Sequence, residues 1–208
     1  MSTRYLRTFR LRFNGLVLLL SLGVWIVCLG HASFAHAGEE RIARLTAAAL
    51  TNSEWSVSAE LTRWHPTPIR EDLNNGIPKD LYYYILLKKR QPGWFDEEIV
   101  SKTIKHTIKY DVLKRQYSIT TRMDGQTGQK IVESFEEMAD LISRIDRVRV
   151  VATKRMKARH TYYVSIKAEM RATNVPFYLE YIFFFIPALE LDTPWADSAP
   201  FYALEKSP

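Results

Sequence analysis

Residues of the types that most often carry out chemistry are few in this chain. After residue 37 the histidines are His65, His106 and His160, and none has the spacing of an H-x-H or H-E-x-x-H zinc site. A histidine-centred metal or acid–base site therefore has no support in the pattern. His106 falls on the apolar face of a predicted strand, so we interpret it as a structural residue.

The acidic residues form two clusters, and both have structural explanations. Glu136 and Glu137 open a predicted helix, where negative charge is favourable. Asp96-Glu97-Glu98 follows a turn at Gly93-Trp94-Phe95 and is interpreted in the same way. A hydrolase with paired carboxylates remains an alternative, although linear spacing cannot identify such a pair.

Glycine and cysteine usage argues against cofactors. The five glycines after residue 37 form no nucleotide-binding loop, and no G-x-S-x-G nucleophile motif is present. Cys28 is the only cysteine and lies inside the N-terminal apolar run, which leaves the rest of the chain without a thiol. We expect no metal, no cofactor and no catalytic residue, and interpret the protein as non-enzymatic.

Residues 1–37 resemble a secretory signal. Four arginines precede the apolar run 16–29, and Ala35-His36-Ala37 provides a small-x-small cleavage site. Cleavage after Ala37 is the favoured interpretation, and an uncleaved membrane anchor is the alternative. In either case we expect the remainder of the chain to be exported to the periplasm, soluble or tethered.

The net charge of +6 comes largely from this segment. The chain has 29 Lys and Arg against 23 Asp and Glu. Residues 1–37 hold four of the basic residues and no acidic ones, which leaves 25 against 23, a net charge of +2. Nucleic acid is therefore not an expected partner.

Apolar residues alternate with polar ones along most of the chain after residue 54. The pattern begins at Trp55, continues through 104–110 and 117–123, and returns at 148–153 and 161–171. Residues 81–87 are apolar or aromatic on both faces, which predicts a central strand covered on both sides. A capping box at Ser134 predicts one helix around 134–145. We predict an all-β fold, an antiparallel β-sandwich (immunoglobulin-like or similar) over 55–208 with that single crossover helix. Residues 38–54 are predicted to form a lead-in helix or tether.

Two segments are candidate contact surfaces. Positive charge gathers in the second half of the chain, and an apolar run spans 176–191. The basic candidates for an acidic partner or anionic surface are Arg147, Arg149, Lys154, Arg155, Lys157 and Arg159. The apolar candidates are Phe183, Phe184 and Phe185. The basic set can also be interpreted as part of a solvated hairpin. The apolar set can also be interpreted as a segment that covers the sandwich.

Several motifs resemble those of DUF4390, a bacterial family of exported domains of unknown function. They are Gly76-Ile77-Pro78, Trp94-Phe95-Asp96, Ser134-Phe135-Glu136-Glu137 and the aromatic segment from Pro176 to Trp195. The resemblance spans about residues 55–201. It implies an exported protein with no established activity, whose gene often lies beside that of a membrane sensor histidine kinase. It supplies no catalytic residues. In structural terms, we expect Trp94 to cap a core and Asp96 to accept backbone N–H bonds.

These observations favour a periplasmic interaction module that modulates a membrane partner such as a sensor kinase. A domain that binds lipid or an envelope polymer is the second hypothesis. The sequence leaves the oligomeric state open.

Overall fold

A computed structural model describes residues 40–51, 54–152, 156–157, 159–173 and 191–203. They belong to a compact unit that spans Gly38–Pro208. In this part of the chain, neither helix is long and apolar enough to cross a bilayer.

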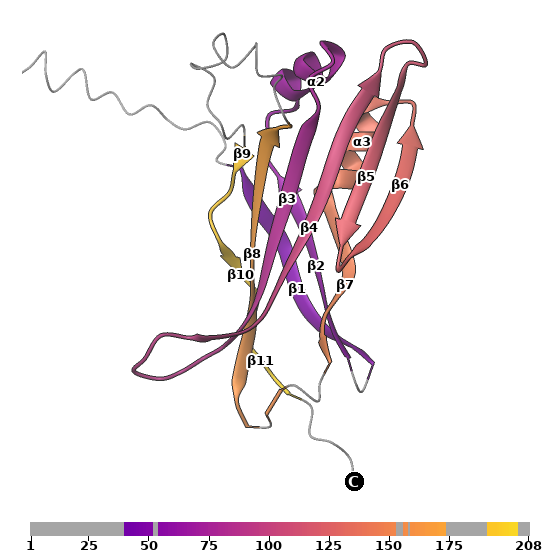
Figure 1. Ribbon diagram of the computed structural model, residues 1–208. Helices are drawn as coiled ribbons and strands as arrows, with labels where there is room; N and C mark the ends of the chain where they lie inside the picture. The colour runs from indigo at the N-terminus through magenta and orange to yellow at the C-terminus, as the bar shows by residue number, and fades with distance from the viewer. Residues whose placement is uncertain (1–39, 52–53, 153–155, 158, 174–190, 204–208) are drawn as a thin grey trace, which may run out of the picture. The chain divides into compact units, whose positions relative to one another are not determined.

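Eleven strands in the described residues form two antiparallel sheets (Figure 1). The smaller sheet has the order β1-β2-β7, and the larger has the order β10-β8-β3-β4-β5-β6, with β9 and β11 also paired to β8. The prediction of an antiparallel β-sandwich is confirmed. The strands are β1 (Arg41–Thr51), β2 (Glu54–Thr62), β3 (Lys79–Lys89), β4 (Glu97–Asp111), β5 (Gln116–Met123), β6 (Gln126–Val132), β7 (Arg144–Ala152), β8 (Thr161–Ala172), β9 (Leu191–Asp192), β10 (Ala196–Asp197) and β11 (Phe201–Tyr202).

The core lies between the two sheets and is centred on β3. Leu81, Tyr83, Ile85 and Leu87 alternate along this strand and are fully buried, as the period of two requires. The hydroxyl of Tyr83 donates a 2.6 Å hydrogen bond to the carbonyl of Ile142, so its one polar atom is satisfied inside the core. This bond also joins the large sheet to the helix that leads into the small one.

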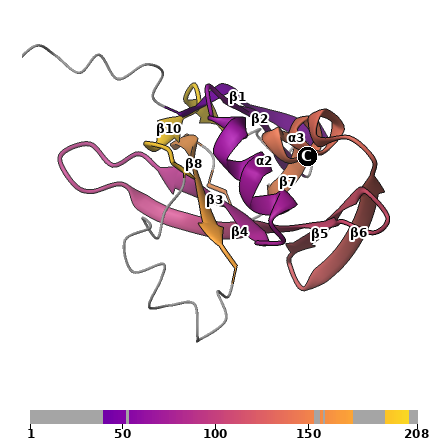
Figure 2. The same ribbon diagram turned by 90° about the horizontal axis from the view of Figure 1, so that it is seen from above.

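That helix is α3 (Phe135–Ser143), the predicted crossover helix. Ser134 accepts a hydrogen bond from the N–H of Glu137 at 3.1 Å, which confirms the capping position. The helix ends two residues earlier than expected, because Arg144 is already extended and begins β7. Figure 2 shows α3 and a second helix side by side over the same end of the sheets.

The second helix, α2 (Pro66–Asn74), corrects the prediction of a single helix. Its first turn contains two prolines. Proline usually indicates a loop in a sequence, but it is also compatible with the first turn of a helix. Ile69 and Leu73 lie one turn apart and are buried. Arg70 donates a hydrogen bond to Glu136 and lies 4.3 Å from the ring centroid of Phe135, which links α2 to α3.

The lead-in helix predicted over 38–54 is also wrong, because Arg41–Thr51 forms strand β1. β1 pairs with β2 in a register that places Ile42 opposite Leu61 and Ala47 opposite Val57. Its alanines carry little period-two signal. Pairing with an already amphipathic strand decides the conformation, as tertiary context often does.

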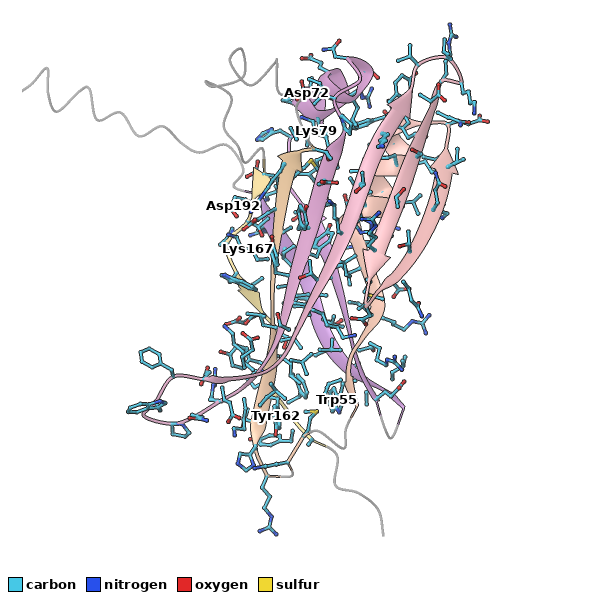
Figure 3. All side chains as sticks on the ribbon, in the orientation of Figure 1. Trp55, Asp72, Lys79, Tyr162, Lys167 and Asp192 are labelled. Carbon is cyan, nitrogen blue, oxygen red and sulfur yellow. The ribbon has the colours of Figure 1, made fainter. Side chains whose placement is uncertain are left out.

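The sandwich has two distinct ends, which we call the α2 end and the hairpin end. Strand register places the start of β1, the start of β3 and the finish of β8 at the α2 end. The β3–β4 connection and the approach to β8 lie at the other, where Lys89 pairs with Tyr162. Figure 3 shows Asp72 and Lys79 at the first end and Trp55 and Tyr162 at the second. β8 has 12 residues, so the ends are about 36 Å apart.

Candidate functional site

The β3–β4 hairpin, residues 90–96, projects from the sandwich at the hairpin end (Figures 1 and 2). Its turn contains Pro92-Gly93, and Gly93 has φ of +79°, a conformation that favours glycine. Trp94 and Phe95 follow and are 77% and 87% exposed. The expectation that Trp94 caps a core is therefore wrong. Two adjacent large aromatic residues face solvent here, which is uncommon for residues of this type.

Asp96 fixes the base of this hairpin. Its Oδ1 accepts the backbone N–H of Gln91 at 3.0 Å, as the sequence predicts, and its Oδ2 accepts the hydroxyl of Tyr163 on β8 at 2.5 Å. The hydrogen bond from Tyr163, followed by that from Gln91, lowers the pKa of Asp96. Burial and then the bond to Asp96 raise the pKa of Tyr163 to about 12. One carboxylate thus closes the loop and joins it to the sheet.

Further contacts hold the hairpin against β8. The N–H of Arg90 donates to the carbonyl of Thr161 at 2.9 Å, and Lys89 forms an ion pair with Glu97. These contacts hold the base of the hairpin in place. A binding partner would therefore not have to order the hairpin before it contacts the tip.

Cations and aromatic rings alternate beside this base. Nζ of Lys88 lies 5.9 Å from the ring centroid of Tyr163 and 5.7 Å from that of Trp195, and the guanidinium of Arg90 lies 5.7 Å from Tyr163. Distances of this size are typical of cation–π contacts. We call this set, together with Trp94 and Phe95, the hairpin surface.

A shallow polar depression lies next to the hairpin surface, with a volume of about 250 Å³. Its lining is mostly charged, and it consists of Lys89, Glu97, Glu98, Ile99, Lys157 and Tyr162. The N–H of Lys157 donates to the Tyr162 hydroxyl at 2.8 Å, which brings one of the predicted basic residues to this end.

Three of the other basic candidates are also described, on two different elements. Arg147 and Arg149 lie on exposed positions of β7 in the small sheet, and Arg149 is paired with Glu54 at 3.0 Å. Arg159 is exposed in the connection to β8. Lys154 and Arg155 lie outside the described residues.

The apolar candidates Phe183, Phe184 and Phe185 also lie outside the described residues. The residues that flank their segment, Thr173 and Leu191, are described and lie at the α2 end, where Leu191 pairs with Met170. The segment therefore joins the domain about 36 Å from the hairpin end. The segment is therefore attached at the end opposite to Lys157.

The structural interpretation of His106 holds. It is buried, its Nδ1 lies 2.8 Å from Thr121 Oγ1, and burial lowers its pKa to about 4. Within the described ranges, no group of three or more His, Cys, Asp or Glu side chains could hold a metal ion.

The model of a family described as a domain of unknown function, DUF4390, matches residues 39–198. This chain belongs to the DUF4390 family. The match begins before the motifs that suggest the resemblance and includes β1, in agreement with the place of that strand in the sandwich. No curated protein and no solved structure matches the chain.

Sequence reasoning assigned Trp94 of this DUF4390 member to the core, whereas both Trp94 and Phe95 face solvent. A signal for their exposure was available. A Pro-Gly turn directly before two aromatic residues, with charged residues on both sides, places those residues at a loop tip, where little of the fold can cover them.

Proposed function

We propose that this DUF4390 protein is an exported, non-enzymatic interaction module that binds a protein partner through the hairpin surface. The observation that carries the proposal is the exposure of Trp94 and Phe95 at the tip of a hairpin whose base is fixed by Asp96. Exposed aromatic residues on a preorganised support are typical binding anchors.

The chemistry around the tip favours a protein over a lipid surface. Asp96 and Glu97 have lowered pKa values, the first through its bond to Tyr163 and the second through its bond to Lys89. They stay ionised at neutral pH, and ionised carboxylates are repelled by anionic headgroups. A protein surface can match both signs of charge around two aromatic anchors.

The proposed partner is a membrane protein with a periplasmic region, such as a sensor histidine kinase, because the family resemblance implies a neighbouring gene for such a kinase. The signal-like segment at residues 1–37 supports export, because its arginines and cleavage site are typical of secretion. Lys157, one of the basic candidates within the described residues, lines the depression beside the hairpin, and we assign it to the contact.

Site-specific photocrosslinking in intact cells tests the proposal. A photoreactive residue is placed at position 94 or 95 of the full chain, with Ile131 on β6 as the control because it is also apolar and exposed. We expect an adduct with one membrane protein from 94 and 95 and none from 131. No adduct at either hairpin position, or equal adducts at all three, would contradict the proposal.

Charge reversal sharpens the assignment of the surface. Lys157→Glu is expected to lower recovery of the adduct several-fold, since interfacial charges contribute to specificity. Arg147→Glu is the matched control, because Arg147 lies on the small sheet. Equal losses from the two variants would show that bulk charge and not the hairpin end is recognised.

A further inference from the structure

The turn between β4 and β5, residues 112–115, exposes aliphatic side chains at the α2 end. Val112 is 59% exposed and Leu113 is 95% exposed. The turn is closed by Asp111, whose Oδ1 accepts the N–H of Leu113 at 3.0 Å and that of Lys114 at 3.1 Å. Because the backbone is held this way, Leu113 projects beyond the strands and packs on nothing in the described residues.

Cations follow the aliphatic pair directly. Lys114 and Arg115 are exposed, and Arg115 has φ of +53°, which ends the turn and returns the chain into β5. Asp111 is the acidic residue within the turn, and its Oδ1 is engaged by backbone N–H groups. An aliphatic tip with adjacent basic residues matches the layering of an anionic bilayer, with acyl chains below negatively charged headgroups.

Both strongly apolar runs of the sequence join the domain at this same end. Residues 177–186 lie between Thr173 and Leu191. The N-terminal run, residues 16–29, precedes Arg41, the first residue of β1, in the sequence.

From these observations we propose that the β4–β5 turn docks on an anionic phospholipid bilayer, with Val112 and Leu113 entering the interface and Lys114 and Arg115 contacting headgroups. The hairpin surface then points away from the membrane. This inference uses residues at the opposite end from the proposed partner contact, so either can fail without the other.

The experiment measures the depth of single positions in the full chain. Cys28→Ser removes the only cysteine; Leu113→Cys or Phe95→Cys then carries an environment-sensitive fluorophore, both at highly exposed sites. The protein is reconstituted into phosphatidylcholine vesicles with or without about one third phosphatidylglycerol. We expect the label at 113 to shift to the blue and to lose several-fold in accessibility to an aqueous quencher, while the label at 95 stays accessible.

The lipid composition and the adjacent charges provide the decisive comparison. Phosphatidylglycerol should increase the shielding of position 113, and Lys114→Glu with Arg115→Glu should remove that increase. Equal accessibility at 113 and 95 in anionic vesicles would overturn the proposal. Shielding that is the same in neutral and anionic vesicles, or an increase that the charge-reversed variant retains, would overturn the assignment of an anionic surface. Unchanged circular dichroism excludes unfolding as the cause of either result.

Discussion

The hydroxyl of Tyr163 on β8 donates a 2.5 Å hydrogen bond to Asp96, the residue directly before β4. β3 lies between these two strands in the sheet. The bond therefore reaches across the base of the hairpin, on the side where Asp96 also accepts the N–H of Gln91. It couples a loop that could otherwise move freely to a long strand of the large sheet.

Tyr163→Phe is expected to loosen the hairpin without unfolding the domain. The ring and its packing are kept, and only the hydroxyl that holds Asp96 is lost. Amide hydrogen exchange should accelerate across residues 90–96 and stay unchanged in β3 and β8, because local opening is independent of global unfolding. Recovery of the partner crosslinked at position 94 should fall in the same variant.

A lost partner adduct in Tyr163→Phe with unaltered exchange would contradict this account. That result would show that the Tyr163 hydroxyl contacts the partner itself. Tyr84→Phe is the matched control, since Tyr84 also presents a hydroxyl on this sheet, at 3.4 Å from Glu169 and away from the hairpin.

Ser134→Ala is expected to destabilise the domain by about 1 kcal/mol, the usual cost of losing a helix N-cap. The lost interaction is the 3.1 Å bond from the N–H of Glu137. Urea unfolding measures the change, and Ser134→Asp should restore most of it because aspartate caps equally well. Equal destabilisation by both variants would point to packing and not to capping.

The same helix shows which elements sequence alone can predict. α3 combines a cap with a helical apolar face, and β2, β4, β5 and β8 carry a clear period of two, so local pattern and final structure agree. β1 and α2 were missed because neither has a strong local signal. β1 is set by pairing with β2, and α2 by burial of Ile69 and Leu73 against the sheets.

The candidate site was less accessible to sequence reasoning for a related reason. Nearness along the chain suggested one basic patch, but β7 carries Arg147 and Arg149 on the small sheet while Lys157 lies beside the hairpin. The aromatic ring of Trp94 likewise suggested a core role for that residue, whereas the hairpin exposes Trp94 and Phe95 to solvent. Exposure of this kind depends on how far a loop projects, which local pattern does not encode.

Stability should fall as the pH drops below 6.5, through His106. Burial lowers its pKa from 6.5 to about 4 in the folded protein, so the unfolded chain takes up the proton first. The contribution is fully present above the unfolded pKa and is lost as the pH falls toward about 4. Between pH of about 7 and about 5 we expect a loss of about 2 kcal/mol in the free energy of unfolding.

This pH range separates His106 from the carboxylates. Burial raises the pKa of Asp80, but its hydrogen bonds with Lys105 and Thr107 outweigh this effect and keep the pKa below 3.8. The pKa of Glu169 is likewise lowered, below 4.5. They therefore act at lower pH. Urea unfolding at several pH values measures the slope, and His106→Gln should flatten it between pH of about 7 and about 5. An unchanged slope in this variant would assign the effect elsewhere.

The Lys79–Asp72 pair is expected to hold α2 on the end of the sandwich. Nζ of Lys79 lies 2.5 Å from Oδ2 of Asp72, and the lysine side chain is completely buried while the aspartate is partly exposed. Figure 3 shows the two residues together where α2 meets β3. Asp72→Asn should cost about 2 kcal/mol, because it removes a carboxylate charge that lies against a buried ammonium.

Removing both charges tests whether the pair is coupled. The double variant Asp72→Asn, Lys79→Met should lose less stability than the sum of the two single variants, since the methionine has similar length and carries no charge to desolvate. Urea unfolding of the four proteins gives the coupling directly. If the two single losses simply add, the ion pair contributes nothing specific, and α2 is held by the burial of Ile69 and Leu73.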